Sequence, residues 1–428
     1  MEKPPSANDP TGSNSRACIP DTLLHSFENL RLNNGIGSGY AGFPYNASLT
    51  ASGSRNGGMF LEAPNLQHPT GGFHPSINRV GGYGANCHQI LTSSDAINVA
   101  PVPRQNIIFL AALTPEGSET LKQYLSSKNS AATDIIFEAV IDSIFELMTD
   151  QVGHCVFGNL IHLCNKGQLH MIVKKLEMHP EAMAAVCINR YGSPSVKKLI
   201  KLVAKSDSDS LAISMVEGLH KVFNQLMVHK TGCHVIVQCL ETLSINHNEL
   251  LHIAAIENAL YLATHVNGCL ALNSVIDVIK GPRRNELLES IADLAVCLSQ
   301  DPYGNFVVQN LLGLQYPNIT KKICSLLKDH YTRISTLKGG SHVVEKCLKS
   351  TERGYAVEAF VECQGQALVN VARDQFGNYV IQTALRETKY ADRALHDRLV
   401  MKLRAHQVHL QRGYGRNVFN LIVNQDSY

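Results

Sequence analysis

The chain of 428 residues has no tryptophan, only 6% aromatic residues and a formal net charge of just +2. Leu, Ile, Val and Ala dominate its apolar residues instead, which favours stacked helices over a β-sandwich. A net charge so close to zero gives no global sign of a nucleic-acid partner, so such a function would have to rest on local groups of residues. Hydrophobic residues make up 44% of the chain, enough for a large core.

The twelve cysteines are scattered from Cys18 to Cys363, and no two of them form a CxxC pair. Cys87 is followed by His88, but no second pair stands at zinc-finger spacing. We therefore predict reduced thiols, no metal site and no cofactor. The chain also lacks a run of about 18 apolar residues, and its N-terminal segment lacks the apolar centre of a signal peptide. These absences predict a soluble, intracellular protein without a membrane partner.

The first ninety or so residues are rich in Gly, Ser, Asn and Pro, as in SANDPTGSNS and SGSRNGG. Such a composition buries too little apolar surface to offset the entropy of ordering the backbone. We predict a disordered tail over residues 1–89 and one folded domain over residues 90–428. Within the tail, residues 21–32 have apolar residues at helical spacing, which is typical of a transient helix or of a short partner-binding segment.

From about residue 100 apolar residues recur at helical spacing, and the segment 133–148 is predicted to be one helix with Thr133 and Asp134 near its N-cap. Short turns with a glycine separate such segments. Successive glycines of this set are 36 to 40 residues apart: Gly117, Gly153, Gly192, Gly232, Gly268, Gly304, Gly340, Gly377 and Gly415. This period predicts an all-α solenoid, in which each repeat buries its apolar face against its neighbours.

A common pattern follows each of these glycines. The first and fifth residues after the glycine, here called the reading positions, share one face of a helix because they are i and i+4. The second residue, here called the stacking position, is often a flat ring. Before Gly304, Asp301 and Pro302 form an N-cap and first-turn pair for this helix.

Three consecutive repeats carry complete sets at these positions. The Gly304 and Gly377 repeats have Asn and Gln at the reading positions, and two amides match the acceptor–donor–acceptor edge of uracil. The Gly340 repeat has Ser and Glu, and an ionised Glu only accepts, which suits the two adjacent donors of guanine. A ring at the stacking position can stack on a base. The three sets are Asn305, Phe306 and Gln309; Ser341, His342 and Glu345; and Asn378, Tyr379 and Gln382.

These sets resemble the base-reading motifs of the Pumilio (PUF) family, and the resemblance runs from about residue 90 to the C-terminus. It implies a right-handed α-solenoid of eight three-helix repeats with a C-terminal cap, here YGRNVFNLI with Arg416 and Asn420. It also implies one RNA base per repeat on an antiparallel strand, so that Asn378 and Gln382 meet the 5′ base and the site reads 5′-UGU.

What the resemblance implies about function is sequence-specific binding of single-stranded mRNA, in 3′ untranslated regions, to regulate translation and mRNA stability. The expected partners are translation-repression or deadenylation factors. The protein is expected to be a cytoplasmic monomer, with a nuclear presence left open. The target transcripts and the role of the tail stay undetermined.

The N-terminal half departs from the family pattern. In the Gly268 repeat, Leu270 lies between Cys269 and Asn273, and the resemblance to a Cys/Gln pair suggests adenine. In the Gly232 repeat, Cys233 and His234 are followed by a valine at the second reading position. The remaining departures are Ser118 and Lys122 in the Gly117 repeat; His154, Cys155 and Gly158 in the Gly153 repeat; and Ser193, Pro194 and Lys197 in the Gly192 repeat. The two lysines suit phosphates better than base edges, so we expect base selectivity to fade towards the 3′ end of the site.

Two other kinds of binding protein stay open as alternatives. A solenoid of HEAT or armadillo type that grips proteins would predict no base-matched pairs after the glycines. A PUF-like protein that binds ribosomal RNA with weak sequence preference would predict widely distributed Lys and Arg. An enzyme is disfavoured, because pairs such as His154 with Cys155 lack a third orienting group. The predicted RNA-binding residues are Asn378, Tyr379, Gln382, Ser341, His342, Glu345, Asn305, Phe306, Gln309, Cys269, Asn273, Cys233 and His234.

Overall fold

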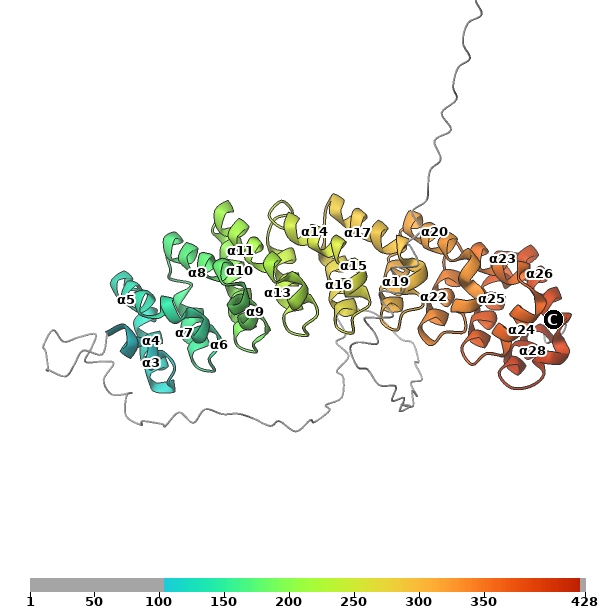
Figure 1. Ribbon diagram of the computed structural model, residues 1–428, viewed down its shortest axis with the longest axis horizontal. Coiled ribbons are helices and arrows are strands. Elements are labelled where there is room, and N and C mark those ends of the chain that lie inside the picture. The colour runs from blue at the N-terminus through green and yellow to red at the C-terminus, as the bar shows by residue number, and fades with distance from the viewer. Residues whose placement is uncertain (1–103, 424–428) are drawn as a thin grey trace, which may run out of the picture. The chain divides into compact units, whose positions relative to one another are not determined.

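The computed structural model describes residues 104–423 (Figure 1). The predicted tail over residues 1–89, the helical pattern at 21–32 and the domain boundary at residue 90 lie outside the described residues. Every regular element within 104–423 is a helix. The prediction of an all-α solenoid is confirmed.

The helices form eight groups of three and a final pair, in agreement with eight repeats and a cap. The groups are α3 (Arg104–Ala112), α4 (Pro115–Ser126) and α5 (Ser130–Val140); α6 (Ile144–Thr149), α7 (Gly153–Leu160) and α8 (Lys166–Met178); α9 (Pro180–Ile188), α10 (Gly192–Lys205) and α11 (Asp209–Lys221); α12 (Phe223–Met227), α13 (Cys233–Thr242) and α14 (Glu249–Glu257); α15 (Ala259–Ala263), α16 (Gly268–Val278) and α17 (Pro282–Asp293); α18 (Ala295–Leu298), α19 (Gly304–Gly313) and α20 (Pro317–Leu326); α21 (Tyr331–Ile334), α22 (Lys338–Lys349) and α23 (Gly354–Glu362); and α24 (Gly365–Arg373), α25 (Gly377–Ala391) and α26 (Arg393–Arg404). The pair is α27 (Gln407–Leu410) and α28 (Gly415–Val423), and two 3₁₀ helices are η1 (Ile141–Ser143) and η2 (Lys328–His330).

Equivalent helices of successive groups pack side by side. The middle helices follow one another from α4 to α28, and the third helices run along the upper edge in Figure 1. The apolar side chains of all three helices meet in one continuous core, in which residues such as Phe157, Leu272 and Phe360 are fully buried. Each repeat extends this core by packing against the repeat before it, as expected for a solenoid.

The repeat glycines are required by a close approach between the middle helix and the first helix of the same group. A Cβ atom on Gly377 would lie 2.4 Å from the carbonyl oxygen of Val371, and one on Gly192 would lie 2.3 Å from that of Val186. Both distances are far shorter than van der Waals contact. Any side chain at these positions would therefore push the two helices apart, which explains why the period is marked by glycine.

A side chain three residues before the repeat glycine caps most of the middle helices. Asp301 Oδ1 accepts hydrogen bonds from the backbone N–H groups of Tyr303 and Gly304, both at 2.8 Å. Asp374 does the same in the Gly377 repeat, at 2.8 and 2.9 Å. Asp301 thus satisfies the N–H groups at the start of α19, but the prediction of Asp301 as N-cap and Pro302 in the first turn is wrong, because the N-cap residue is Tyr303 and the helix begins at Gly304. Thr114, Asp150, Asn189, His229 and His265 occupy the equivalent place in other repeats.

The prediction of one helix over residues 133–148 is wrong. Helix α5 ends at Val140, and the 3₁₀ helix η1 separates it from α6. The N-cap is Asn129, whose Oδ1 accepts from the N–H of Ala131 at 3.0 Å, while Thr133 is buried inside the helix. The segment passes from the last helix of one repeat to the first helix of the next. Both helices bury an apolar face, so the periodicity continues across a change of direction.

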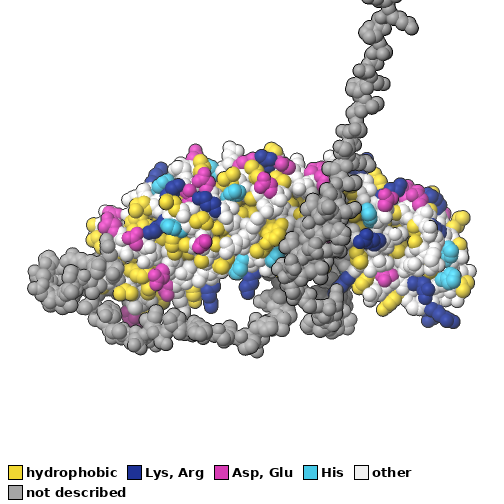
Figure 2. Space-filling view, in the orientation of Figure 1, with side chains coloured by type: hydrophobic (Ala, Val, Ile, Leu, Met, Phe, Trp, Pro, Cys, Tyr) yellow, Lys and Arg dark blue, Asp and Glu magenta, His cyan; other side chains and the backbone are white. Residues whose placement is uncertain are grey.

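Ion pairs and hydrogen bonds connect neighbouring repeats on the third helices. Arg283 on α17 contacts Glu249 on α14 at 2.6 Å, and Lys322 on α20 contacts Glu289 on α17 at 2.7 Å. Acidic and basic side chains are correspondingly interspersed along the upper edge in Figure 2. Solvent weakens such partly exposed pairs, so they link adjacent repeats but contribute little to the stability of the core.

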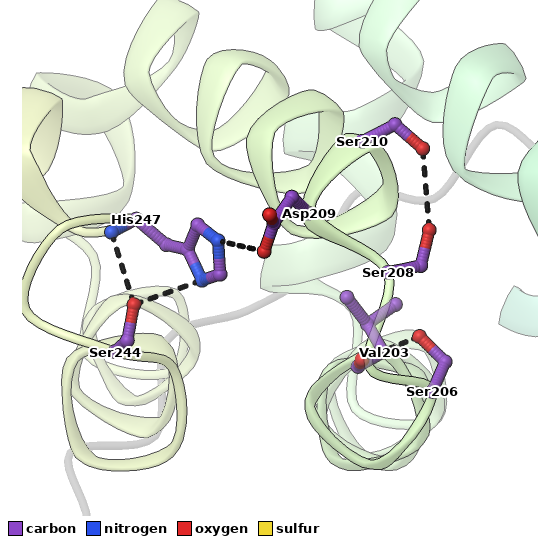
Figure 3. Close-up of polar contacts among 7 residues, drawn as sticks. All are labelled: Val203, Ser206, Ser208, Asp209, Ser210, Ser244 and His247. Carbon is purple, nitrogen blue, oxygen red and sulfur yellow. Dashed lines mark hydrogen bonds and ion pairs between the residues drawn. The ribbon is translucent and has the colours of Figure 1, made fainter.

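One of these connections combines Ser244, His247 and Asp209 (Figure 3). His247 Nε2 lies 3.0 Å from Asp209 Oδ1 at the start of α11, and its Nδ1 lies 2.9 Å from Ser244 Oγ. These residue types also occur in hydrolytic triads. Here, however, Ser244 Oγ accepts the backbone N–H of His247 at 3.2 Å and is exposed, so it closes a turn instead of lying in the water-excluded surroundings that a nucleophile uses.

Candidate nucleic-acid interface

In the Gly304 and Gly377 repeats the middle helix buries the first reading position and exposes the stacking position. Asn305 and Asn378 are 2% and 0% exposed, whereas Phe306 and Tyr379 are 52% and 56% exposed. His342 on α22 is exposed as well. Helices α19, α22 and α25 pack in succession, so three rings from consecutive repeats extend into solvent from neighbouring helices. Such rings offer flat surfaces for stacking.

The two amides of the Gly377 repeat are hydrogen-bonded to each other. Gln382 Nε2 donates to Asn378 Oδ1 at 2.9 Å. Asn378 Nδ2 in turn donates to the carbonyl oxygens of Asp374 and Gln375, at 2.9 and 3.0 Å. Since carbonyls only accept, this contact fixes which way the Asn378 amide points. Both donors of Asn378 therefore face the protein.

This geometry differs from the expectation that two amides face the base together. Asn378 acts as an anchor that orients Gln382. Gln382 is buried as well, but its exposed fraction of 8% is larger than the 0% of Asn378. Its Oε1 accepts from Arg386 Nη2 at 3.0 Å. Gln382 Nε2 has a second N–H besides the one that it donates to Asn378, so Gln382 can offer this donor to a base and, in exchange for the contact with Arg386, its Oε1 as an acceptor.

The Gly304 repeat has the same arrangement. Asn305 Nδ2 donates to the carbonyl oxygens of Asp301 and Pro302, and Gln309 Nε2 donates to Asn305 Oδ1 at 3.0 Å. The recurrence of this network two repeats apart indicates that the residue types and their spacing determine it.

The Gly340 repeat presents a carboxylate instead. Ser341 Oγ is buried and donates to the carbonyl oxygen of Lys338 at 3.1 Å. Glu345 is half-buried, and its oxygens have only long contacts, at 3.9 Å to His342 Nδ1 and 4.0 Å to Lys349 Nζ. The carboxylate therefore keeps lone pairs available for donors from a ligand.

Gly339 is a residue that sequence reasoning missed. A Cβ atom there would lie 2.4 Å from Asn305 Nδ2 and 2.5 Å from its Cγ. The anchor of the Gly304 repeat thus fits only because the next repeat has no side chain at this point. The double glycine Gly339–Gly340 was a visible signal, since the other repeats have a larger residue before the repeat glycine.

In the Gly268 and Gly232 repeats the reading positions are less complete. Cys269 Sγ lies 3.5 Å from the carbonyl oxygen of Val266, and Asn273 Oδ1 is buried without a hydrogen-bond partner. Leu270 is 63% exposed at the stacking position. Cys233 is half-buried and His234 is exposed. The pKa of His234 is nevertheless lowered, first by partial desolvation of its ring and then by the positive charge of the nearby Lys197. His234 is therefore a neutral ring near pH 7.

The Gly153 and Gly192 repeats carry no complete set. Ser193 is buried, and Pro194 is exposed at the stacking position. The ring of His154 instead stacks on Tyr191, with centroids 4.9 Å apart and planes at 25°. The guanidinium of Arg190 lies 5.0 Å from the centre of the Tyr191 ring. Sequence reasoning missed both Arg190 and Tyr191, which stand directly before Gly192.

The cysteines, the potential metal ligands and the helix lengths of the described part of the chain bear on other kinds of site. The ten cysteines found there are free, and burial raises the pKa of Cys187 to about 12, so this thiol stays protonated. Within residues 104–423 no group of three or more His, Cys, Asp or Glu side chains could hold a metal ion. No helix in that range is both long and apolar enough to cross a membrane.

Comparisons with known proteins place these features in a family. The sequence matches the Pumilio-family RNA binding repeat over residues 143–177, 223–251, 258–292, 295–324, 338–352 and 368–395. These ranges leave out α10, the middle helix of the Gly192 repeat. Pumilio homolog 18 of Arabidopsis thaliana is 30% identical over 282 residues, which cover 65% of this chain and 85% of that protein.

Pumilio homolog 11 of the same plant is 31% identical over 76% of this chain. The chain spans only 57% of that relative and 47% of Pumilio homolog 12. Among solved structures, the Puf4 RNA binding domain bound to the HO endonuclease RNA 3′ UTR recognition sequence is 27% identical. It has a TM-score of 0.62, and the match covers 73% of this chain and 98% of that one.

Proposed function

Because this chain belongs to the Pumilio (PUF) family of RNA-binding repeat proteins, we propose that it binds single-stranded RNA in a sequence-specific manner. The sites contain a 5′-UGU core, which the Gly377, Gly340 and Gly304 repeats read in that order. The observation that carries this proposal is the recurrence of an exposed ring beside a polar reading pair in three consecutive repeats.

The proposed recognition uses a ring and an edge-facing side chain for each base. Tyr379, His342 and Phe306 provide the stacking surfaces. Gln382 and Gln309 each offer a donor and an acceptor, which matches the imide N–H and a carbonyl of uracil. Glu345 offers only acceptors, which matches the N1–H and the exocyclic amine of guanine. Each base is thus selected by complementary donors and acceptors.

We propose that the RNA is mRNA and that the sites lie in 3′ untranslated regions. The RNA in the Puf4 complex is a 3′ UTR recognition sequence, which supports this choice. Binding would regulate translation and mRNA stability in the cytoplasm, through repression or deadenylation factors recruited to the bound chain. The protein acts as a monomer and catalyses no reaction itself.

In vitro selection from a random RNA pool with the full chain tests the proposal. UGU should be enriched. In a short RNA, replacement of its G by A should weaken binding by about 1–3 kcal/mol, the scale of one specific base contact. That corresponds to roughly 5- to 150-fold in Kd.

Each alternative predicts a different result of this selection. RNA binding without sequence enrichment would favour a ribosomal-RNA type of protein. No RNA binding at all would favour a protein-binding solenoid.

A further inference from the structure

Helix α10 concentrates positive charge in a chain that is nearly neutral overall. It carries Lys197, Lys198, Lys201 and Lys205 and has no acidic residue. The preceding middle helix, α7, has no Asp, Glu, Lys or Arg. In the part of the chain that the structure describes, Lys197, Lys198 and Lys201 form no ion pair. These ammonium groups are therefore available to an anion from outside.

Lys198 occupies the place of a reading side chain in the repeat before its own. Gly158 stands at the second reading position of the Gly153 repeat, and a Cβ atom there would lie 3.0 Å from Lys198 Nζ. Where the Gly377 repeat has the amide of Gln382, the Gly153 repeat thus has the cation of its neighbour.

The other positions of these two repeats do not support base reading. Cys155 and Pro194 stand at the stacking positions, and neither has an aromatic ring. His154, at a first reading position, is engaged with Tyr191 in a stack that also includes Arg190. His154 Nδ1 also lies 3.1 Å from the carbonyl oxygen of Asp150. Ser193, at the other first reading position, is buried and so does not face a ligand, whereas the cations Arg190, Lys197 and Lys198 lie on the same two repeats.

We propose that the Gly153 and Gly192 repeats form a phosphate-binding site, which holds the RNA strand without reading its bases. This inference rests on the proposed function. Lys197 and Lys198 provide the charge, with Lys201 one turn further along α10. An ammonium group is a flexible point charge that only donates, so it suits phosphate oxygens more than one particular base edge. RNA is favoured over an acidic protein, because α7 and α10 continue the row of middle helices that carries the reading positions.

The test uses the full chain and RNAs in which a UGU core is followed on its 3′ side by two natural nucleotides, which reach the Gly268 and Gly232 repeats. Two further nucleotides, which reach the Gly192 and Gly153 repeats, form the extension and are either natural or abasic. Abasic nucleotides keep the phosphates and remove the bases. The abasic extension should raise affinity as much as the natural one does. In the double variant Lys197→Ala/Lys198→Ala this gain should disappear, whereas binding of the unextended UGU core should persist.

Ionic strength provides a second readout. Each phosphate contact to a single strand contributes about −0.7 to the slope of log K against log salt concentration, so the double variant should lose about 1.4 from that slope. The matched control is Lys166→Ala/Lys321→Ala, which removes two exposed lysines from the outer helices α8 and α20. It should leave both the slope and the gain from the extension unchanged.

The outcomes separate this inference from the proposed function. The proposed function would be overturned if the unaltered chain did not bind RNA with a UGU core. Intact UGU binding with an inert abasic extension would overturn only the phosphate site. A natural extension that binds much better than the abasic one would also overturn it, since these repeats would then read bases. The phosphate site would also be overturned if a poly-glutamate peptide competed for the lysines while the abasic extension was inert. That result would indicate an acidic protein partner.

Discussion

At the scale of single residues, each Asn–Gln reading pair combines a buried anchor with a second amide that lies nearer the surface. Asn378 is held by two backbone carbonyls, and Gln382 is held by Asn378. The side chain that meets a base is therefore oriented before the base arrives. Such preorganisation reduces the entropy lost on binding.

Exchanging the reading pair of the Gly340 repeat should exchange its base. In Ser341→Asn/Glu345→Gln the new Asn can bond to the carbonyl of Leu337, as Asn378 does to that of Asp374, and orient the new Gln. The preferred core should change from UGU to UUU, because the carboxylate that accepts the donors of guanine is gone. Fluorescence anisotropy with the two RNAs measures the change.

The single variant Glu345→Gln is the control for this exchange. It removes the carboxylate without adding the anchor, so it should lose the preference for G and gain less for U. An unchanged preference for G in the double variant would contradict the role of this repeat.

Gly339→Ala should damage the reading of the third base although Gly339 itself reads nothing. The new methyl group would overlap the Asn305 amide and displace the anchor of Gln309. We expect discrimination between U and C at the third base to fall several-fold while discrimination at the first base is kept. Gly354→Ala is the control, because a Cβ atom there meets nothing within 4 Å. Equal losses at all bases would mean that the whole fold had been disturbed.

The residues at the stacking positions should differ in how much each contributes to the free energy of RNA binding. Tyr379→Ala and Phe306→Ala should each cost about 1–3 kcal/mol of binding free energy, the value of stacking on an aromatic side chain. Leu270→Ala should cost less binding free energy, and Cys155→Ala should hardly change the affinity. Titration of one RNA with all four variants measures this. A uniform loss would show that the N-terminal repeats bind bases in another way.

Sequence patterns could predict which residues stand at the reading positions, but not which way their amides point. The i and i+4 spacing of Asn378 and Gln382 only indicates a shared helix face. The direction depends on free carbonyls in the turn before the helix, and that turn is set by the cap at Asp374. For the same reason the role of Gly339 becomes clear only once Asn305 has been placed.

At the scale of elements, the turn before each middle helix determines where its reading positions begin. Asp374→Ala should destabilise the protein by about 1 kcal/mol, the usual cost of losing a side-chain cap. Urea denaturation followed by circular dichroism measures the shift in midpoint. Asp374→Asn keeps an oxygen that can accept the same N–H groups, and it should behave nearly like the unaltered chain. Equal losses in both variants would point to the charge of Asp374 rather than to its cap.

Helix boundaries at the junctions between repeats were harder to predict than the repeats themselves. The glycine period is a strong signal, because a Cβ atom would collide with a backbone carbonyl at Gly377 and Gly192 alike. The junction at residues 141–143 has no such marker. The apolar pattern runs on from the last helix of one repeat into the first helix of the next, so only the packing of the repeats shows where one helix ends and the other begins.

At the scale of the whole described region, the complete sets and the unpaired lysines occupy different parts of one continuous row of middle helices. The complete sets lie on α19, α22 and α25, and the unpaired lysines lie on α10. The formal net charge of +2 does not reveal the local group of lysines, since the outer helices carry charges of both signs in ion pairs between repeats. Bulk charge is therefore a poor guide to the partners of a solenoid.

The contact between the last helix and the last reading pair limits how such an array could be lengthened. Asn417 Nδ2 on α28 lies 3.3 Å from Asn378 Oδ1. The cap thus completes the surroundings of the anchor in the Gly377 repeat as well as covering the core. A designer who inserted a ninth repeat before α27 would replace Asn417 by another side chain and alter the reading of the existing first base. An insertion between two inner repeats would leave this border intact, so the array is better extended from its interior than from its end.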